Sequence, residues 1–238
     1  MLAEFVQELL KLKRPETFEV HGRPYATSPL HAMADPMADA VKVGTLTGLV
    51  DLYRADLDKV KTMSVAVHVQ SHTQVSIIGL AVNDWAKRRY YVQAVRPESR
   101  DFEFNEWLAP ERFIIGLQSM FFPSDDLTML LGICSTISAE SVSVSEDDGI
   151  TQKATFGRSV AFKENKPLKP IVELQPYRTF GEVEQPSSKF LFRVRQVMEG
   201  KAVQCMLTEA DGGLWRQQAM HNMKQWFEAR NLDLPIIS

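Results

Sequence analysis

The sequence predicts an α+β fold with mostly antiparallel β-sheets, hairpins, and helices packed on the sheets. Three observations lead to this prediction. Alternating strand patterns come in pairs that short turn sequences join, helical patterns come in separate clusters, and the two kinds do not alternate as they would in a βαβ protein. The last long pattern is helical, so we expect a C-terminal helix that packs on a sheet.

The first hundred residues predict helices and hairpins. We expect a helix over 1–12 that stops at Pro15, a hairpin over 17–28 that turns at Gly22, an irregular segment over 29–41, a helix over 46–58, a hairpin over 63–82 and a strand over 88–97. Thr45 is the residue type that caps the 46–58 helix at its N-terminus.

The rest of the chain continues in the same way. We expect a helix over 109–121, a helix over 123–137, a hairpin over 140–156 that turns at Asp148–Gly149, a strand over 169–177, a hairpin over 188–209 and a helix over 214–231. Pro110 and Ser124 suit the N-termini of the two middle helices. In the last helix, Trp215 and Trp226 are spaced to face the same way.

The length of 238 residues suits one large domain or two small ones, and the composition, with 45% hydrophobic residues, is that of a globular protein. Segments 94–107 and 163–170 are the best candidates for boundaries. We therefore expect an N-terminal α+β part over 1–100 and a C-terminal α+β part over 101–238, or one continuous domain.

Charge and cysteine content indicate a cytoplasmic protein. The net charge of −3 produces no overall attraction to nucleic acid or anionic lipid, although local basic patches are compatible with it. Cys134 and Cys205 lie in apolar runs and are expected to be buried free thiols. Residues 1–12 carry Glu4 and Glu8 without a basic leader, and no apolar run of about 18 residues occurs, so we expect neither a signal peptide nor a membrane partner.

The stretch from Pro176 to Gln196, PYRTFGEVEQPSSKFLFRVRQ, combines aromatic, cationic and acidic residues in an unusual density. Its second half alternates as a strand. One face carries Phe190, Phe192, Val194 and Gln196, and the other carries Leu191, Arg193, Arg195 and Val197. The simpler interpretation puts the aromatic face in the core and leaves the arginine face solvated or paired with Glu182, Glu184 or Glu209.

A functional interpretation of the same stretch is an anion-binding face. Arg193 and Arg195 point the same way, about 6.5–7 Å apart, because a strand rises about 3.3 Å per residue. With Tyr177 and Arg178 from the preceding loop, they form a candidate ligand-binding set that grips a phosphate or stacks a base. The nearby acidic residues Glu182 and Glu184 argue against it, since they would neutralise the patch.

Other motifs predict no catalytic residue, metal site or cofactor. His68 and His72 lack further ligands at zinc spacing, and the acidic run 145–149 lacks the ligand positions of a calcium loop. Gly212 and Gly213 precede a helix but are not followed by P-loop residues, so they suit a helix start. A non-enzymatic protein is therefore favoured over an enzyme, although a site assembled from distant residues stays open.

Four segments resemble an uncharacterised protein family of bacteriophages and prophages, with the general layout of the YfdQ-like prophage proteins. They are EWLAPERFIIGLQSMF, EDDGITQKATF, LQPYRTFGEVEQPSSKFLFRVR and LTEADGGLWRQQAMHNMKQWFE, within residues 100–228. The resemblance implies expression in the cytoplasm of a bacterial host during phage growth, and it carries over no activity and no site residues.

Two main hypotheses of function follow. The first is a phage-encoded, non-enzymatic accessory protein that binds a nucleotide or nucleic acid and serves phage DNA metabolism or counter-defence. The alternative is an oligomeric assembly protein or a virion-associated structural protein, suggested by abundant apolar residues and ten methionines. A homo-oligomer is expected under either hypothesis.

Overall fold

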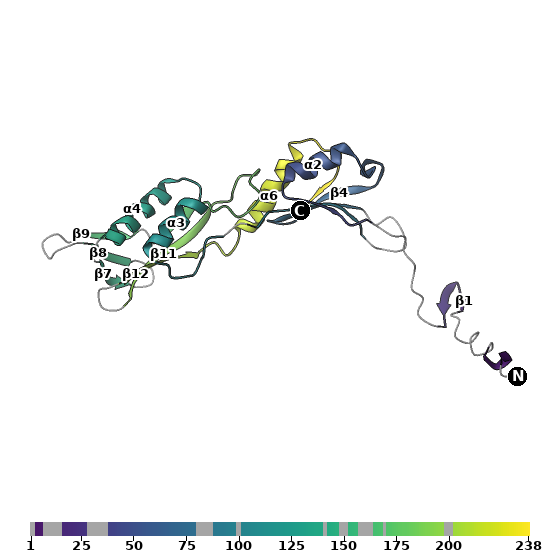
Figure 1. The fold of residues 1–238 in the computed structure, drawn as a ribbon, viewed down its shortest axis with the longest axis horizontal. Helices are drawn as coiled ribbons and strands as arrows, with labels where there is room; N and C mark the ends of the chain where they lie inside the picture. The colour runs from purple at the N-terminus through teal and green to yellow at the C-terminus, as the bar shows by residue number, and fades with distance from the viewer. Residues whose placement is uncertain are drawn as a thin grey trace. The chain divides into compact units, whose positions relative to one another are not determined.

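The computed structural model describes residues 3–6, 16–27, 38–79, 88–98, 101–139, 142–147, 152–156, 164–168, 170–197 and 202–238. Internal contacts divide the chain into two units, Met1–Ala38 and Asp39–Ser238. The described elements are helices and sheets rich in antiparallel pairs, with a long helix near the C-terminus (Figure 1). The predicted α+β fold is therefore confirmed.

The first unit contains the predicted hairpin. Strand β1 (Thr17–Val20) pairs antiparallel with β2 (Arg23–Ala26). The turn between them places His21 and Gly22 at φ angles of 53° and 76°, a left-handed conformation that glycine adopts without strain. Of the helix expected over 1–12, residues 3–6 are helical and the others lie outside the described residues.

A five-stranded sheet opens the second unit. Its order is β13 (Ile236–Ile237), β4 (Val65–Ser71), β5 (Gln74–Gly79), β6 (Tyr90–Val95) and β3 (Val41–Val43). The three central strands pair antiparallel as predicted, while the edge strands β3 and β13 join their neighbours in parallel. Sequence analysis missed both edge strands, because two or three residues are too few to show alternation.

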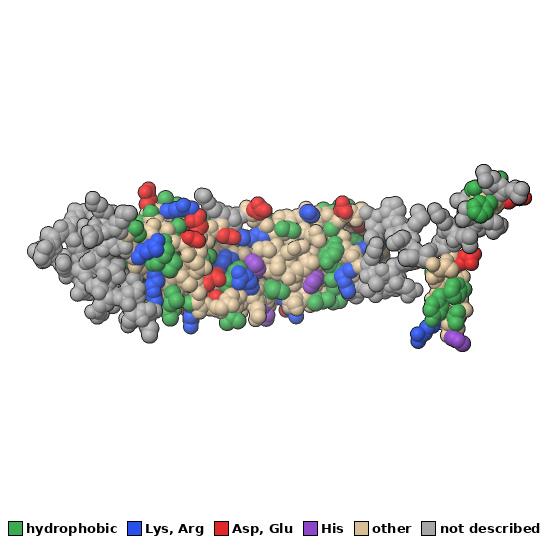
Figure 2. Space-filling view, turned by 90° about the horizontal axis from the view of Figure 1, so that it is seen from below, with side chains coloured by type: hydrophobic (Ala, Val, Ile, Leu, Met, Phe, Trp, Pro, Cys, Tyr) green, Lys and Arg blue, Asp and Glu red, His purple; other side chains and the backbone are tan. Residues whose placement is uncertain are grey.

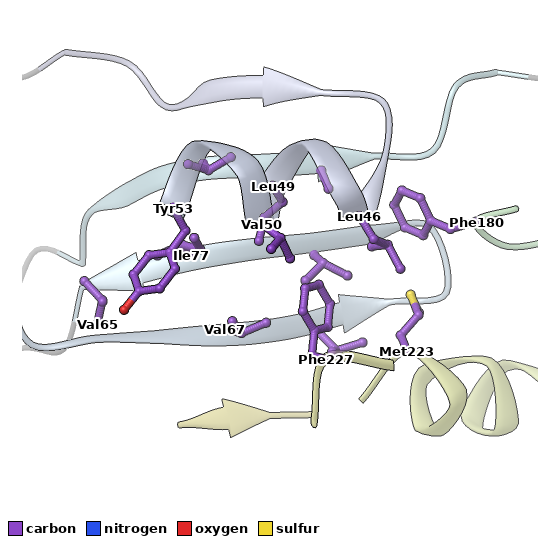
Figure 3. Packing of buried hydrophobic residues seen from close by; sticks show 14 of the residues in the cluster. Leu46, Leu49, Val50, Tyr53, Val65, Val67, Ile77, Phe180, Met223 and Phe227 are labelled. Carbon is purple, nitrogen blue, oxygen red and sulfur yellow. The ribbon is translucent and has the colours of Figure 1, made fainter. Parts of the chain in front are cut away.

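Two helices cover one face of this sheet: α2 (Leu46–Ala55) and α6 (Trp215–Glu228) (Figure 1). The predicted cap is present, since the Thr45 side chain accepts a hydrogen bond from the Gly48 backbone N–H at 3.0 Å. Helix α2 ends where Asp56 turns left-handed, and the short 3₁₀ helix η1 (Val60–Thr62) leads into β4. Figure 3 shows side chains of α2 pointing at the sheet beside Met223 and Phe227 of α6.

The buried stripe of α6 contains Trp215 but not Trp226, although the two are predicted to face the same way. It consists of Trp215, Ala219, Met223 and Phe227. These positions are four residues apart, which places them on one side of a helix. Leu214 precedes the helix and is exposed, and Trp226 is half-buried beside the stripe. The helix thus packs on the sheet mainly through Phe227 and its partners one turn apart.

A second sheet in this unit has the order β10 (Ile171–Leu174), β11 (Ser188–Val197) and β12 (Ala202–Glu209), all antiparallel. Helices α3 (Pro110–Met120) and α4 (Asp125–Ala139) lie over one of its faces (Figure 1). Their predicted starts are confirmed: Pro110 is the first residue of α3, and Ser124 Oγ accepts from the Leu127 N–H.

A third sheet contains β7 (Val142–Asp147), β8 (Gln152–Phe156) and β9 (Glu164–Leu168). The first two strands form the predicted hairpin, whose turn at 148–149 lies outside the described residues. Strand β9 lies within segment 163–170, one of the two candidate boundaries. Pro167 is compatible with a strand because β9 is at the edge of its sheet.

The described hydrophobic residues of the second unit gather in two clusters. The first cluster draws on residues between Phe102 and Leu207, around α3, α4, β11 and β12. The second joins residues between Leu46 and Ala94 to Phe180, Val183 and α6. The division into 1–100 and 101–238 stays a prediction, and the chain after β12 returns to the sheet formed by residues before 100. No described helix combines the length and apolar character needed to cross a bilayer.

Both cysteines should be unreactive in the folded protein. Cys134 and Cys205 are fully buried in the first cluster and free, and a side-chain hydrogen bond to Cys205, together with burial, raises the pKa of Cys134. Because the thiolate is the reactive form, a thiol reagent should label neither residue in buffer and both in urea. Labelling is counted by mass spectrometry, and rapid stoichiometric modification of the native protein would contradict this expectation.

Candidate functional site

The loop between β10 and β11 is a buried connection between the two hydrophobic clusters. Phe180 and Val183 belong to the second cluster, while Phe190 on the following strand belongs to the first. Gln185 is buried and accepts from the backbone N–H groups of Arg178 and Thr179 at 2.9 and 3.0 Å. Its amide nitrogen donates to two carbonyls of the same loop, so one side chain holds the loop folded.

Arg178 lies inside this connection and is only 6% exposed. Its guanidinium forms an ion pair with Glu209, donates to Ser188 Oγ and lies 3.9 Å from the centroid of the Trp215 ring. Burial lowers the pKa of Arg178 to about 10, against the opposing influence of Glu209, and the side chain still carries its charge at neutral pH. Arg178 is therefore an internal partner of Glu209.

His72 packs on the same tryptophan. Its ring lies 4.7 Å from the Trp215 ring, edge to face. Burial, followed by the charges of Arg216, Arg96 and Arg178, lowers the pKa of His72, so the ring is neutral at physiological pH. In the part of the chain that the structure describes, no group of three or more His, Cys, Asp or Glu residues is placed to hold a metal ion.

The structure does not bring the four predicted ligand-binding residues together. Arg178 contacts Ser188 and the Phe190 ring, which places it on the aromatic face of β11. Arg193 and Arg195 lie on the opposite face, because side chains alternate along a strand. Tyr177 is 43% exposed and its ring packs 4.3 Å from the ring of Phe122.

The outer face of β11, opposite to α3 and α4, carries a row of cations: Lys189, Arg193 and Arg195. Arg195 is exposed, and its Nε and Nη2 both donate to Gln204 Oε1, at 2.9 and 2.7 Å. Its guanidinium lies 4.4 Å from the centroid of the Trp107 ring. Arg193 is half-buried and its Nη1 donates to the Phe192 carbonyl at 3.1 Å. We call Trp107, Lys189, Arg193, Arg195 and Gln204 the outer-face set.

Apolar side chains and one acid complete the described part of this face. Strand register places Met206 opposite Arg193, and Glu173 opposite Lys189. Glu173 accepts a hydrogen bond from Ser187 Oγ at 2.6 Å. Figure 2 shows Lys and Arg side chains beside hydrophobic and acidic ones on the face that it views. The three cations of the outer-face set thus exceed the acid in number.

Two of the three suggested acidic partners of the arginine face, Glu182 and Glu209, are engaged elsewhere. Glu182 accepts from the Thr47 backbone N–H at the start of α2, at 3.0 Å. Glu209, the third suggested partner, is paired with Arg178 on the aromatic side of the sheet. The backbone carbonyl of Glu184 accepts from the Asn222 side chain of α6.

Sequence analysis missed two members of the outer-face set. Lys189 shares the alternation of Arg193 and Arg195 and could have been found by extending that pattern two residues towards the N-terminus. Trp107 is far away in sequence and reaches the face because the neighbouring Leu108 forms a β-bridge with Cys205 of β12. No local sequence pattern predicts such a contact.

No known protein family, curated protein or solved structure matches the chain.

Proposed function

We propose that the protein is a non-enzymatic binding protein for a nucleotide or nucleic acid, and that the outer-face set forms its binding surface. The observation that supports this is the row of three cations on one face of β11, with the Arg195 guanidinium over the Trp107 ring, 4.4 Å from its centroid. Cations recognise phosphates, and aromatic rings or guanidinium planes stack on bases. The outer-face set thus offers cations for the phosphate of a nucleotide and, beside them, planar groups for its base.

We propose that this activity belongs to phage biology, because four segments of the sequence resemble prophage proteins. A phage-encoded accessory protein with such a surface would act in the cytoplasm of the host, in DNA metabolism or in counter-defence. Arg178 and Tyr177 have different roles in this proposal. Arg178 forms a buried ion pair with Glu209, and the Tyr177 ring packs against the ring of Phe122. Neither residue belongs to the outer-face set.

Replacing Arg193 and Arg195 together by alanine should remove binding while the fold survives. Arg195 is exposed and Arg193 is half-buried. Charges at a surface contribute only about 0–1 kcal/mol each to stability, so the melting temperature should change by a few degrees. Binding of the wild-type protein to a fluorescent oligonucleotide should weaken as salt rises, since the contacts are ionic. Fluorescence anisotropy at several salt concentrations measures both effects.

The matched control is Arg112→Ala, which removes an exposed arginine of α3 that pairs with Glu103. It removes one positive charge from the helical side and leaves the outer-face set intact. Equal affinities of the control and the double variant, or salt-independent binding, would contradict the proposal.

The alternative function is self-association in an oligomeric or virion-associated assembly. Its supporting observation is the five-stranded sheet, whose three central strands contain no Lys, Arg, Asp or Glu. On the face away from α2 these strands carry polar side chains such as His68, Gln70 and Gln93, with Val95 exposed. The cores of protein interfaces are depleted in charge. Light scattering would show a defined oligomer that Gln93→Lys weakens.

A further inference from the structure

We infer that the ligand of the outer-face set is a single-stranded nucleic acid that runs along β11, with an unpaired base stacked on Arg195. This inference rests on the proposed function and narrows it from nucleotides and nucleic acids in general to single strands. It is carried by the geometry of Arg195, by the length of the cation row and by the position of the sheet under α3 and α4.

The guanidinium of Arg195 is held as a flat platform. Two of its nitrogens donate to the same Gln204 oxygen, and its central carbon lies over the Trp107 ring, 4.4 Å from the centroid. The residue is nevertheless exposed, so its guanidinium is accessible to a ligand. Single-stranded bases stack on guanidinium planes and aromatic rings, and such a stack contributes about 1–3 kcal/mol per base. A platform that is fixed in advance loses little conformational entropy when a base binds.

The cations form a line rather than a single pocket. Lys189 and Arg195 are six residues apart on β11, a length of about 20 Å at about 3.3 Å per residue, with Arg193 between them. Half-buried Leu191 and Met206 lie between these charges on the same face. A mononucleotide is too short to use the whole row, whereas an extended strand spans it and brings several phosphates near the cations.

A duplex fits this face less well. Its bases are stacked on one another, so along its length no base face is free to stack on Arg195. Reading the major groove requires a helix or a free two-stranded ribbon that enters it. Here β11 is the central strand of its sheet and α3 and α4 cover the opposite face, so the sheet cannot enter a groove as a ribbon.

The test compares nucleic acids on the full chain by fluorescence anisotropy at constant salt. The probes are a labelled oligonucleotide of mixed sequence and about 12 nucleotides, within the usual site sizes of single-strand binders, the duplex formed with its complement, and a labelled nucleoside triphosphate. We expect the single strand to bind at least about tenfold more tightly than the other two probes. This is the difference in affinity that the stacking of one base produces.

Arg195→Lys separates stacking from charge, because lysine keeps the charge and loses the plane. We expect it to weaken single-strand binding by about tenfold, the effect of losing one stacked base, while Arg193→Lys, the matched control, changes affinity little. Gln204→Ala should give a smaller loss, since it frees the plane to rotate. Circular dichroism checks that the variants fold, and the comparison of probes on the unaltered protein does not depend on them.

The outcomes distinguish this inference from the proposed function. Equal affinity for single strand and duplex, or full retention of affinity in Arg195→Lys, overturns the inference and leaves salt-dependent nucleotide binding in place. Tight binding of the nucleoside triphosphate, without binding of the oligonucleotides, also overturns the inference and leaves nucleotide binding in place. Failure to bind any of the three probes overturns both.

Discussion

Arg178→Ala should lower the free energy of unfolding by about 3–5 kcal/mol, because it leaves an ionised partner inside the protein without its counter-charge. The Glu209 side chain is 25% exposed and pairs with Arg178, whose guanidinium also covers Trp215. A loss of this size is a large share of a stability of about 5–15 kcal/mol. Urea unfolding followed by circular dichroism measures it.

The companion variant Arg178→Met with Glu209→Leu removes both charges and keeps apolar volume. It should be more stable than Arg178→Ala, since neither charge is then left unpaired. Arg195→Ala is the control for removing an arginine that stacks on a tryptophan at the surface, and should cost about 1 kcal/mol or less. If Arg178→Ala costs no more than that control, the buried ion pair does not stabilise the connection as described.

Phe227→Ala should cost about 3–5 kcal/mol, the usual range for removing a large aromatic side chain from a core. Phe227 of α6 is 0% exposed, and its side chain packs with those of α2 and the five-stranded sheet (Figure 3). The expected effect is a large fall in melting temperature with loss of the α6 contacts, measured by thermal unfolding.

Leu214→Ala supplies the comparison within the same segment. Leu214 is 64% exposed just before α6, and surface substitutions usually change stability by no more than about 0.5 kcal/mol. Trp226→Ala should fall between the two, as its side chain is half-buried beside Phe227. Equal melting temperatures for Phe227→Ala and Leu214→Ala would show that α6 does not pack on the sheet through this stripe.

The sequence by itself determined the elements whose signals are local. Thr45 and Ser124 mark the starts of α2 and α4 through side chains that accept from backbone N–H groups three residues away. The hairpin of β4 and β5 follows from its alternation and polar turn, and the two faces of β11 follow from the period of a strand. In each case the forces act between residues that are neighbours in the chain.

Tertiary structure alone decided which of the marked residues meet. Arg178, Arg193 and Arg195 are alike in sequence, yet Glu209 and Trp215 draw the first into the interior, and Trp107 and Gln204 hold the last on the surface. The return of α6 and β13 to the sheet of β4 is equally non-local. Burial of apolar area is favourable wherever a complementary surface is available, whatever the separation along the chain, so these contacts depend on the completed fold and leave no local pattern.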